Sequence, residues 1–167
     1  MGKEDMSSRF EKFIPIVFRH EGGYVNDPDD LGGETNYGIT KRRYPELDIK
    51  NLRKDEAKRI YYRDFYQKMG LEHVGNDLLA LHIMDMGINA GRKRAVYLLQ
   101  ELLLNCTVDG ILGPNTGERL LHAMTTTNMV TAYKAKRIER YYEVSTYRRN
   151  AKFLKGWIKR VNNTKLI

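Results

Sequence analysis

Apolar residues recur three and four positions apart along most of this chain, which is the spacing of helices that bury one face. The first such segment runs from Phe10 to His20. Later segments predict helices at about residues 51–66, 78–90, 93–104, from 114 onward, 128–147 and 153–161. No internal repeat or low-complexity linker interrupts them. The pattern therefore predicts a mainly helical protein.

The segment after the first predicted helix breaks this pattern. Gly22 and Gly23 follow the helix directly, and glycine tolerates the positive φ with which many helices end. We therefore expect the helix to end at this pair and the chain to turn back. The loop continues to Thr40, and Tyr37-Gly-Ile-Thr40 is its clearest strand-like piece, which favours a short hairpin.

The predicted helix at residues 78–90 is apolar nearly all round, so it is expected at the centre of the fold. Its polar exceptions are His82, Asp85 and Asn89, which lie three and four positions apart and so share one face. Buried polar groups need partners. The stripe is thus either a satisfied internal network or a face that contacts a substrate, and the sequence leaves both open.

A glutamate stands where the first helix is expected to end. The helix dipole disfavours a negative charge there, and apolar neighbours such as Phe18 and Tyr37 would add desolvation. Both effects favour the protonated form of Glu21, which a general acid requires. The alternative is a solvated surface glutamate before a turn. Four more carboxylates follow in the loop: Asp27, Asp29, Asp30 and Glu34.

The run EGGYVNDPDDLGGETNYGIT, residues 21–40, resembles the signature of the glycoside hydrolase 108 family. These are lysozyme-like N-acetylmuramidases found in phage endolysins and once called secretion-activator proteins. In that family the glutamate of EGGY is the catalytic acid, so the resemblance assigns this role to Glu21. DGILGPNT at residues 109–116, with Leu99-Gln100 and Gly156-Trp157, is similar to the family's C-terminal peptidoglycan-binding region.

The resemblance implies a lysozyme-like helical fold with a small hairpin after the first helix and a C-terminal helical subdomain packed against it. We expect a catalytic region at residues 8–91 and a peptidoglycan-binding region at 92–163, with a soft boundary. The expected function is hydrolysis of the β-1,4 bond between N-acetylmuramic acid and N-acetylglucosamine. The alternatives are a lytic transglycosylase and a non-catalytic module that binds the cell wall or assists secretion.

Glycoside cleavage conventionally needs a second carboxylate. Asp30, nine residues after Glu21, is our first choice for this role. Glu34, Asp27 and Asp85 are the alternatives. The residues expected to contact the substrate are Tyr24, Glu34, Thr35, Asn36, Tyr37 and Asp85, although Tyr37 could equally be a core residue.

The net charge of +8 implies attraction to an anionic partner. Basic and aromatic residues crowd the C-terminal third, where they could form a solvated helix face, an envelope-binding surface or a nucleic-acid site. No nucleic-acid-binding motif is legible. The charge alone does not choose among these partners. The family resemblance implies peptidoglycan glycan strands as the partner, with an anionic envelope surface as a further candidate, and no nucleic acid is expected.

Other chemistries lack their motifs. The acidic loop does not fit the EF-hand pattern, no HExxH sequence is present, and no phosphate-binding loop or nucleophile elbow appears. No metal or cofactor is expected. The single cysteine, Cys106, follows three leucines and is expected to be buried and inert. With no signal peptide or membrane span recognised, we expect a monomer made in the cytoplasm that reaches the wall after lysis or dedicated export.

Overall fold

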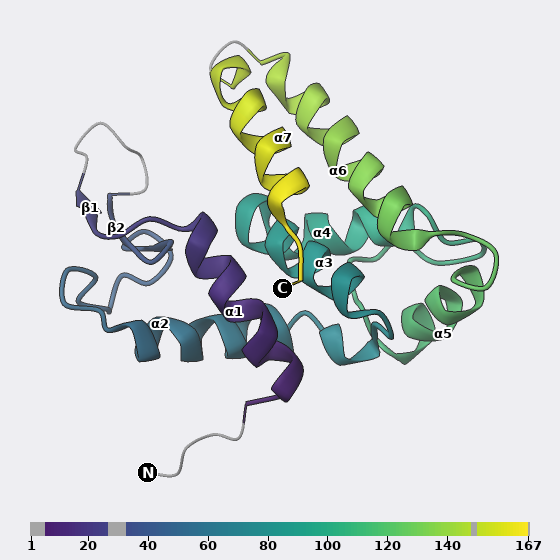
Figure 1. Ribbon diagram of the computed structural model, residues 1–167, viewed down its shortest axis with the longest axis horizontal. Coiled ribbons are helices and arrows are strands. Elements are labelled where there is room, and N and C mark those ends of the chain that lie inside the picture. The colour runs from purple at the N-terminus through teal and green to yellow at the C-terminus, as the bar shows by residue number, and fades with distance from the viewer. Residues whose placement is uncertain (1–5, 27–32, 148–149, 167) are drawn as a thin grey trace. The chain divides into compact units, whose positions relative to one another are not determined.

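The computed structural model describes residues 6–26, 33–147 and 150–166, and it confirms a mainly helical, lysozyme-like fold with one small sheet. The chain forms two compact units, residues 1–63 and 64–167 (Figure 1). The boundary between these units, after residue 63, lies earlier in the chain than the expected functional boundary after residue 91. The functional boundary remains a prediction.

The first unit contains α1 (Ser8–His20), a three-stranded sheet and α2 (Lys54–Tyr61). One face of α1 is buried through Phe10, Phe13, Ile14, Ile16 and Val17, as the spacing of its apolar residues predicts. The helix predicted at residues 51–66 is shorter, because α2 ends at Tyr61 and the chain continues as a π-helix, η1 (Tyr62–Gln67).

The sheet has the order β1 (Val25–Asn26), β2 (Glu34–Asn36), β3 (Ile39–Thr40), and both pairs are antiparallel. A two-residue turn, Tyr37–Gly38, joins β2 to β3. Both residues have positive φ, 50° and 76°, which is the type I′ geometry whose twist matches that of paired strands. The expected hairpin is therefore present, and its turn sets the position of Gly38.

The second unit is built around α3 (Asp77–Ala90), whose residues from Leu79 to Gly87 are all buried. This confirms the prediction of a central helix. Asn76 caps α3, since its side chain accepts a hydrogen bond from the Leu79 amide at 2.9 Å. The other elements are η2 (Leu71–His73), α4 (Arg92–Gln100), α5 (Pro114–Ala123), α6 (Met129–Ser145), η3 (Ala151–Phe153) and α7 (Leu154–Asn163).

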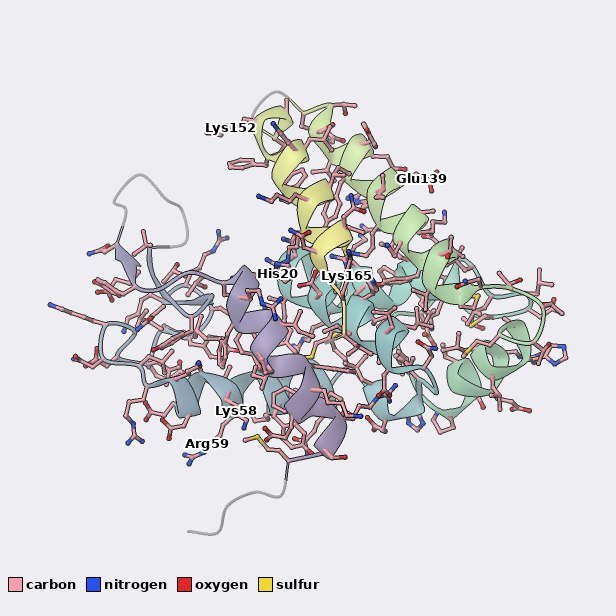
Figure 2. The ribbon with its side chains drawn as sticks, viewed as in Figure 1. His20, Lys58, Arg59, Glu139, Lys152 and Lys165 are labelled. Atoms are coloured by element: carbon pink, nitrogen blue, oxygen red, sulfur yellow. The ribbon has the colours of Figure 1, made fainter. Side chains whose placement is uncertain are left out.

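Helices α4 and α6 both contact α3, and α6 also contacts α7. Charged side chains such as Arg59, Glu139 and Lys152 project from the exposed parts of the two units (Figure 2). No helix in the described ranges combines the length and the apolar character that a membrane crossing needs.

Candidate functional site

Glu21 directly follows α1 and has extended backbone, with φ −95° and ψ 137°. Its amide still donates a hydrogen bond to the Val17 carbonyl at 3.1 Å, so the backbone of Glu21 is anchored to the last turn of the helix. Neither Gly22 nor Gly23 has a positive φ. The helix therefore ends just before the glycine pair, where the sequence placed its end, but the extended conformation of Glu21 ends it and not a positive φ at a glycine.

The Glu21 side chain is half-buried and lies against the backbone of Gly38. A β-carbon added to Gly38 would stand 2.5 Å from Glu21 Oε2 and 2.5 Å from the Tyr61 hydroxyl oxygen. These two oxygens are therefore at most 5.0 Å apart, which is twice 2.5 Å. Only the absence of a side chain at residue 38 leaves room for the carboxyl group.

Tyr61 and Tyr37 fix the turn beside Glu21. The buried Tyr61 donates its hydroxyl to the Tyr37 carbonyl at 2.8 Å. Phe18 lies between the two rings, with centroids 5.6 Å from Tyr37 and 6.0 Å from Tyr61. The ends of α1 and α2 thus hold the hairpin turn, and the turn holds Gly38 against the carboxyl. Tyr37 serves this packing and is still half-exposed.

Three other candidate substrate contacts lie on or beside the sheet. Tyr24 donates its hydroxyl to Glu34 Oε1 at 2.9 Å, and this hydrogen bond to a carboxylate raises the pKa of Tyr24. Thr35 is half-buried, opposite Val25 on one side and Thr40 on the other. Tyr24, Glu34 and Thr35 all remain accessible enough to contact a substrate.

Asn36 does not face a substrate. It is 6% exposed, and its side-chain amide donates to the carbonyls of Ile49 and Leu52 at 3.0 and 3.4 Å. The prediction of a sugar contact at Asn36 is corrected for a physical reason: β2 turns this side chain inward, where it holds the loop before α2.

Asp85 is likewise internal, with 1% of its surface exposed. Its carboxylate accepts hydrogen bonds from Arg137 Nη2 at 2.6 Å and Arg160 Nε at 3.0 Å, and from Thr164 at 3.4 Å. Burial alone would raise the pKa of Asp85, but the charges of Arg137 and Arg160 outweigh it and lower the pKa to about 2. Asp85 is thus a buried ion-pair partner, neither a substrate contact nor a second catalytic carboxylate.

The polar stripe on α3 forms an internal hydrogen-bonded network, the first of the two alternatives, in which Arg137 Nε alone is buried without a partner among the atoms of that network. His82 Nδ1 lies 2.9 Å from Arg137 Nη1, and arginine can only donate, so this nitrogen is the acceptor. Burial and the adjacent Arg137 charge lower the pKa of His82 to about 3, which keeps the ring neutral. Asn89 accepts a hydrogen bond from the Tyr141 hydroxyl at 3.3 Å. The stripe therefore ties α3 to α6 and α7.

Part of the basic C-terminal third is thus structural. Arg137 and Arg160 pair with Asp85, and Lys136 pairs with Glu101 and Glu139 at 3.3 and 3.4 Å. The remaining exposed lysines of this region include Lys152, Lys155 and Lys159.

Gln100 organises the downstream motif. The sequence resemblance included it beside that motif but assigned it no role. Its amide nitrogen donates to Asp109 Oδ1, Ile111 O and Thr116 Oγ1 at 2.8, 3.0 and 3.3 Å. Its amide oxygen accepts from the Asp109 and Gly110 amides at 3.1 and 2.9 Å. A single buried side chain therefore holds both ends of the DGILGPNT segment.

Some predicted residues lie outside the described part of the chain. These are the acidic loop residues Asp27, Asp29 and Asp30, so the first choice for the second carboxylate stays a prediction. Within the described ranges, no group of three or more histidine, cysteine, aspartate or glutamate side chains could hold a metal ion.

Sequence reasoning missed Gly38 and Tyr61, which surround Glu21. The turn itself had a signal, because a glycine between short strand-like residues is typical of two-residue hairpins. Tyr61 had no such signal, since its apolar spacing on α2 indicates only burial.

Residues 14–91 match the family Glycosyl hydrolase 108, and residues 94–162 match the Predicted Peptidoglycan domain. The chain is similar to the solved structure of SagA from Brucella abortus, with a TM-score of 0.77 and 27% sequence identity. That alignment covers 93% of this chain and 90% of the SagA chain. No curated protein sequence matches. The chain therefore carries a glycosyl hydrolase 108 domain at residues 14–91, followed by a match to a predicted peptidoglycan domain at residues 94–162.

Proposed function

We propose that this protein is an N-acetylmuramidase that hydrolyses the β-1,4 bond between N-acetylmuramic acid and N-acetylglucosamine, with Glu21 as its general acid. The family matches support a glycoside hydrolase that acts on peptidoglycan. The observation that carries the finer proposal is the position of the Glu21 carboxyl, anchored to the end of α1 and seated against Gly38.

A general acid must reach one oxygen atom in one geometry, so a fixed side chain is an advantage. Glu21 would give its proton to the glycosidic oxygen as the bond from that oxygen to the anomeric carbon breaks. The sugar ring then carries the positive charge of an oxocarbenium-like transition state. Water adds to the anomeric carbon, and the proton that it loses restores the acid.

The second carboxylate stabilises that charge or positions the water. Asp30 remains our first candidate and Asp27 an alternative. Among the described residues, Glu34 is the best placed, because it starts β2 in the sheet whose hairpin turn contacts Glu21. Asp85 is withdrawn, since its oxygens are already occupied by Arg137, Arg160 and Thr164.

Substrate contacts are proposed for Tyr24, Glu34, Thr35 and Tyr37. Tyr24 and Tyr37 offer aromatic faces for sugar rings, while Glu34 and Thr35 offer polar atoms for hydroxyl and N-acetyl groups. The intended partner is the glycan strand of the cell wall, reached after release from the cytoplasm or by dedicated export.

The proposal is tested by the clearing of purified cell walls. We expect the wild type to clear them and Glu21→Gln to lose this activity while it keeps the fold, measured by circular dichroism. Glu46→Gln is the matched control, because Glu46 is exposed in the same unit and makes the same change of charge. Clearing by Glu21→Gln at the wild-type rate would refute the assignment.

The chemistry of the released sugars separates the two catalytic alternatives. Hydrolysis leaves a reducing N-acetylmuramic acid end, whereas a transglycosylase leaves a product with an anhydro-muramyl ring, lighter by one water. Mass spectrometry resolves the two. A wild-type protein that binds walls but releases neither product would be the non-catalytic module.

A further inference from the structure

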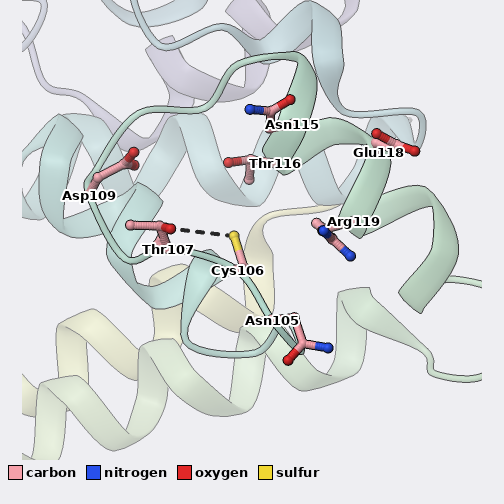
Figure 3. Close-up of a pocket in the computed structure, with 8 residues that line it drawn as sticks. All are labelled: Asn105, Cys106, Thr107, Asp109, Asn115, Thr116, Glu118 and Arg119. Carbon is pink, nitrogen blue, oxygen red and sulfur yellow. Dashed lines mark hydrogen bonds between the residues drawn. The ribbon is translucent and has the colours of Figure 1, made fainter.

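A polar pocket with a volume of about 320 Å³ opens between the loop after α4 and the first turns of α5 (Figure 3). Its size is at the small end of the range for small-molecule sites, about 300–1,000 Å³. None of its lining residues belongs to the proposed muramidase site. They are Asn105, Cys106, Thr107, Asp109, Asn115, Thr116, Glu118 and Arg119.

The walls of this pocket are held in place by buried hydrogen bonds. Gln100 is 1% exposed and ties the Asp109 side of the pocket to Thr116 on α5. Thr116 also donates to the Ile111 carbonyl at 3.1 Å. Pro114 begins α5 at the first helical position, where its missing N–H costs nothing. The pocket is thus formed before any ligand arrives.

Four polar side chains around the pocket have no partner of their own. Asn105, Asn115, Glu118 and Arg119 make no hydrogen bond or ion pair with any residue that the structure describes. Glu118 and Arg119 carry opposite charges and follow each other in sequence, but they do not pair. Both charges are therefore available to a ligand.

Cys106 lies in the same pocket and corrects an expectation. It is half-exposed, and its thiol donates a weak hydrogen bond to the Thr107 carbonyl at 3.6 Å (Figure 3). The leucines before it predicted burial, but α4 ends at Gln100, so the chain turns and leaves Cys106 at the pocket wall. As the only cysteine of the sequence, it can report on the pocket.

The lining selects against a sugar ring and in favour of a peptide. It contains no aromatic side chain, the usual platform for a pyranose face. Instead it offers the guanidinium of Arg119, which suits a carboxylate. It also offers the carboxylates of Glu118 and Asp109, which suit an ammonium group. The hydrogen bond from Gln100 lowers the pKa of Asp109, so that group is charged at neutral pH.

We propose that this pocket binds the stem peptide of peptidoglycan, with Arg119 on a peptide carboxylate and Glu118 on a free ammonium group. The assignment rests on peptidoglycan as the partner in the proposed function, and the pocket lies within residues 94–162, the match to the predicted peptidoglycan domain. A second hollow of about 400 Å³ shares Glu118 and Arg119 and continues past Leu121, His122 and Thr125. It gives a longer peptide room to extend.

The test uses the full chain carrying Glu21→Gln and a synthetic tetrapeptide, L-Ala-γ-D-Glu-L-Lys-D-Ala, followed by isothermal titration calorimetry. We expect saturable binding that weakens about tenfold with Arg119→Gln and about tenfold with Glu118→Gln, the loss of one charged contact each. Lys159→Gln is the control, since it removes an exposed charge of the same unit away from the pocket. It should bind as the parent does.

Two chemical variants of the probe identify the contacts. Acetylation of the lysine amine should weaken binding of the peptide to the parent but not to Glu118→Gln. Amidation of the C-terminal carboxylate should weaken binding to the parent but not to Arg119→Gln. The peptide should also slow alkylation of Cys106 by a maleimide. Equal binding by Arg119→Gln and the parent, or no protection of Cys106, would overturn the proposal.

The outcome is independent of the muramidase assignment. A tetrapeptide contains no glycosidic bond, so its binding does not depend on Glu21. The pocket would instead be a sugar site if the protein bound a peptide-free glycan oligomer but not the tetrapeptide, and if Arg119→Gln weakened the binding of that oligomer. If Glu21→Gln no longer clears walls but the protein does not bind the tetrapeptide, the muramidase assignment stands and only the inference about this pocket is refuted.

Discussion

Replacing Gly38 by alanine tests whether activity depends on the packing of the Glu21 carboxyl against residue 38. The new β-carbon would stand 2.5 Å from Glu21 Oε2, whereas ordinary contacts begin near 3.4 Å, so the carboxyl must move by roughly 1 Å. A 1 Å misplacement of a reacting group can cost about 100-fold in rate. Alanine at φ 76° also strains the backbone by about 1–2 kcal/mol. We therefore expect wall clearing to fall about 100-fold in Gly38→Ala.

Gly33→Ala separates the two effects. Gly33 has a similar φ of 66°, but a β-carbon there meets nothing within 4 Å. This variant should lose about the same 1–2 kcal/mol of stability in urea unfolding and keep most of its activity. The rates are compared on purified walls at equal concentrations of folded protein. Equal losses of activity in both variants would show that Gly38 matters only for the turn, and the argument about Glu21 would fail.

Three further results are expected. Gln100→Leu should destabilise the protein by about 3 kcal/mol in urea unfolding, because it leaves buried polar groups without partners; a change below about 0.5 kcal/mol would contradict this. Stability should fall as the pH drops below about 6.5, because the unfolded chain protonates His82 while the folded pKa of His82 is about 3. At about pH 4.5 the free energy of unfolding should be roughly 3 kcal/mol lower. His82→Gln should weaken this dependence of stability on pH, and the same dependence in that variant would count against the network. Wall clearing should slow as the salt concentration rises, because screening weakens the attraction between a chain of charge +8 and an anionic envelope. A rate of clearing that does not change with salt would show that this attraction does not contribute to activity.

The sequence predicted what hydrophobic spacing and local chemistry determine. The helices follow from apolar periodicity, and α3 was expected at the centre because it is apolar nearly all round. The hairpin was expected from the strand-like piece Tyr37–Thr40, of which the structure makes Tyr37–Gly38 the turn, and the family from the motif that begins at Glu21. These features depend on residues close together along the chain.

The contacts that decide which residues belong to the site and which to the core join residues far apart in the sequence. Tyr61 meets the turn at Tyr37 across 24 positions, and Arg137 meets Asp85 across 52. No spacing rule brings such pairs together before the helices pack. For the same reason the sequence could not tell that Asn36 points inward, since a two- or three-residue strand shows too few positions to reveal which face is buried.

The central claim is that Glu21 supplies the proton that breaks the glycan. Its most direct test is the rate at which new reducing N-acetylmuramic acid ends form on purified peptidoglycan, measured for the wild type, Glu21→Gln and Glu46→Gln. Loss of a general acid is expected to lower this rate by about 10²–10⁴-fold in Glu21→Gln, with Glu46→Gln unchanged. Reducing ends that form at the wild-type rate in Glu21→Gln would contradict the account.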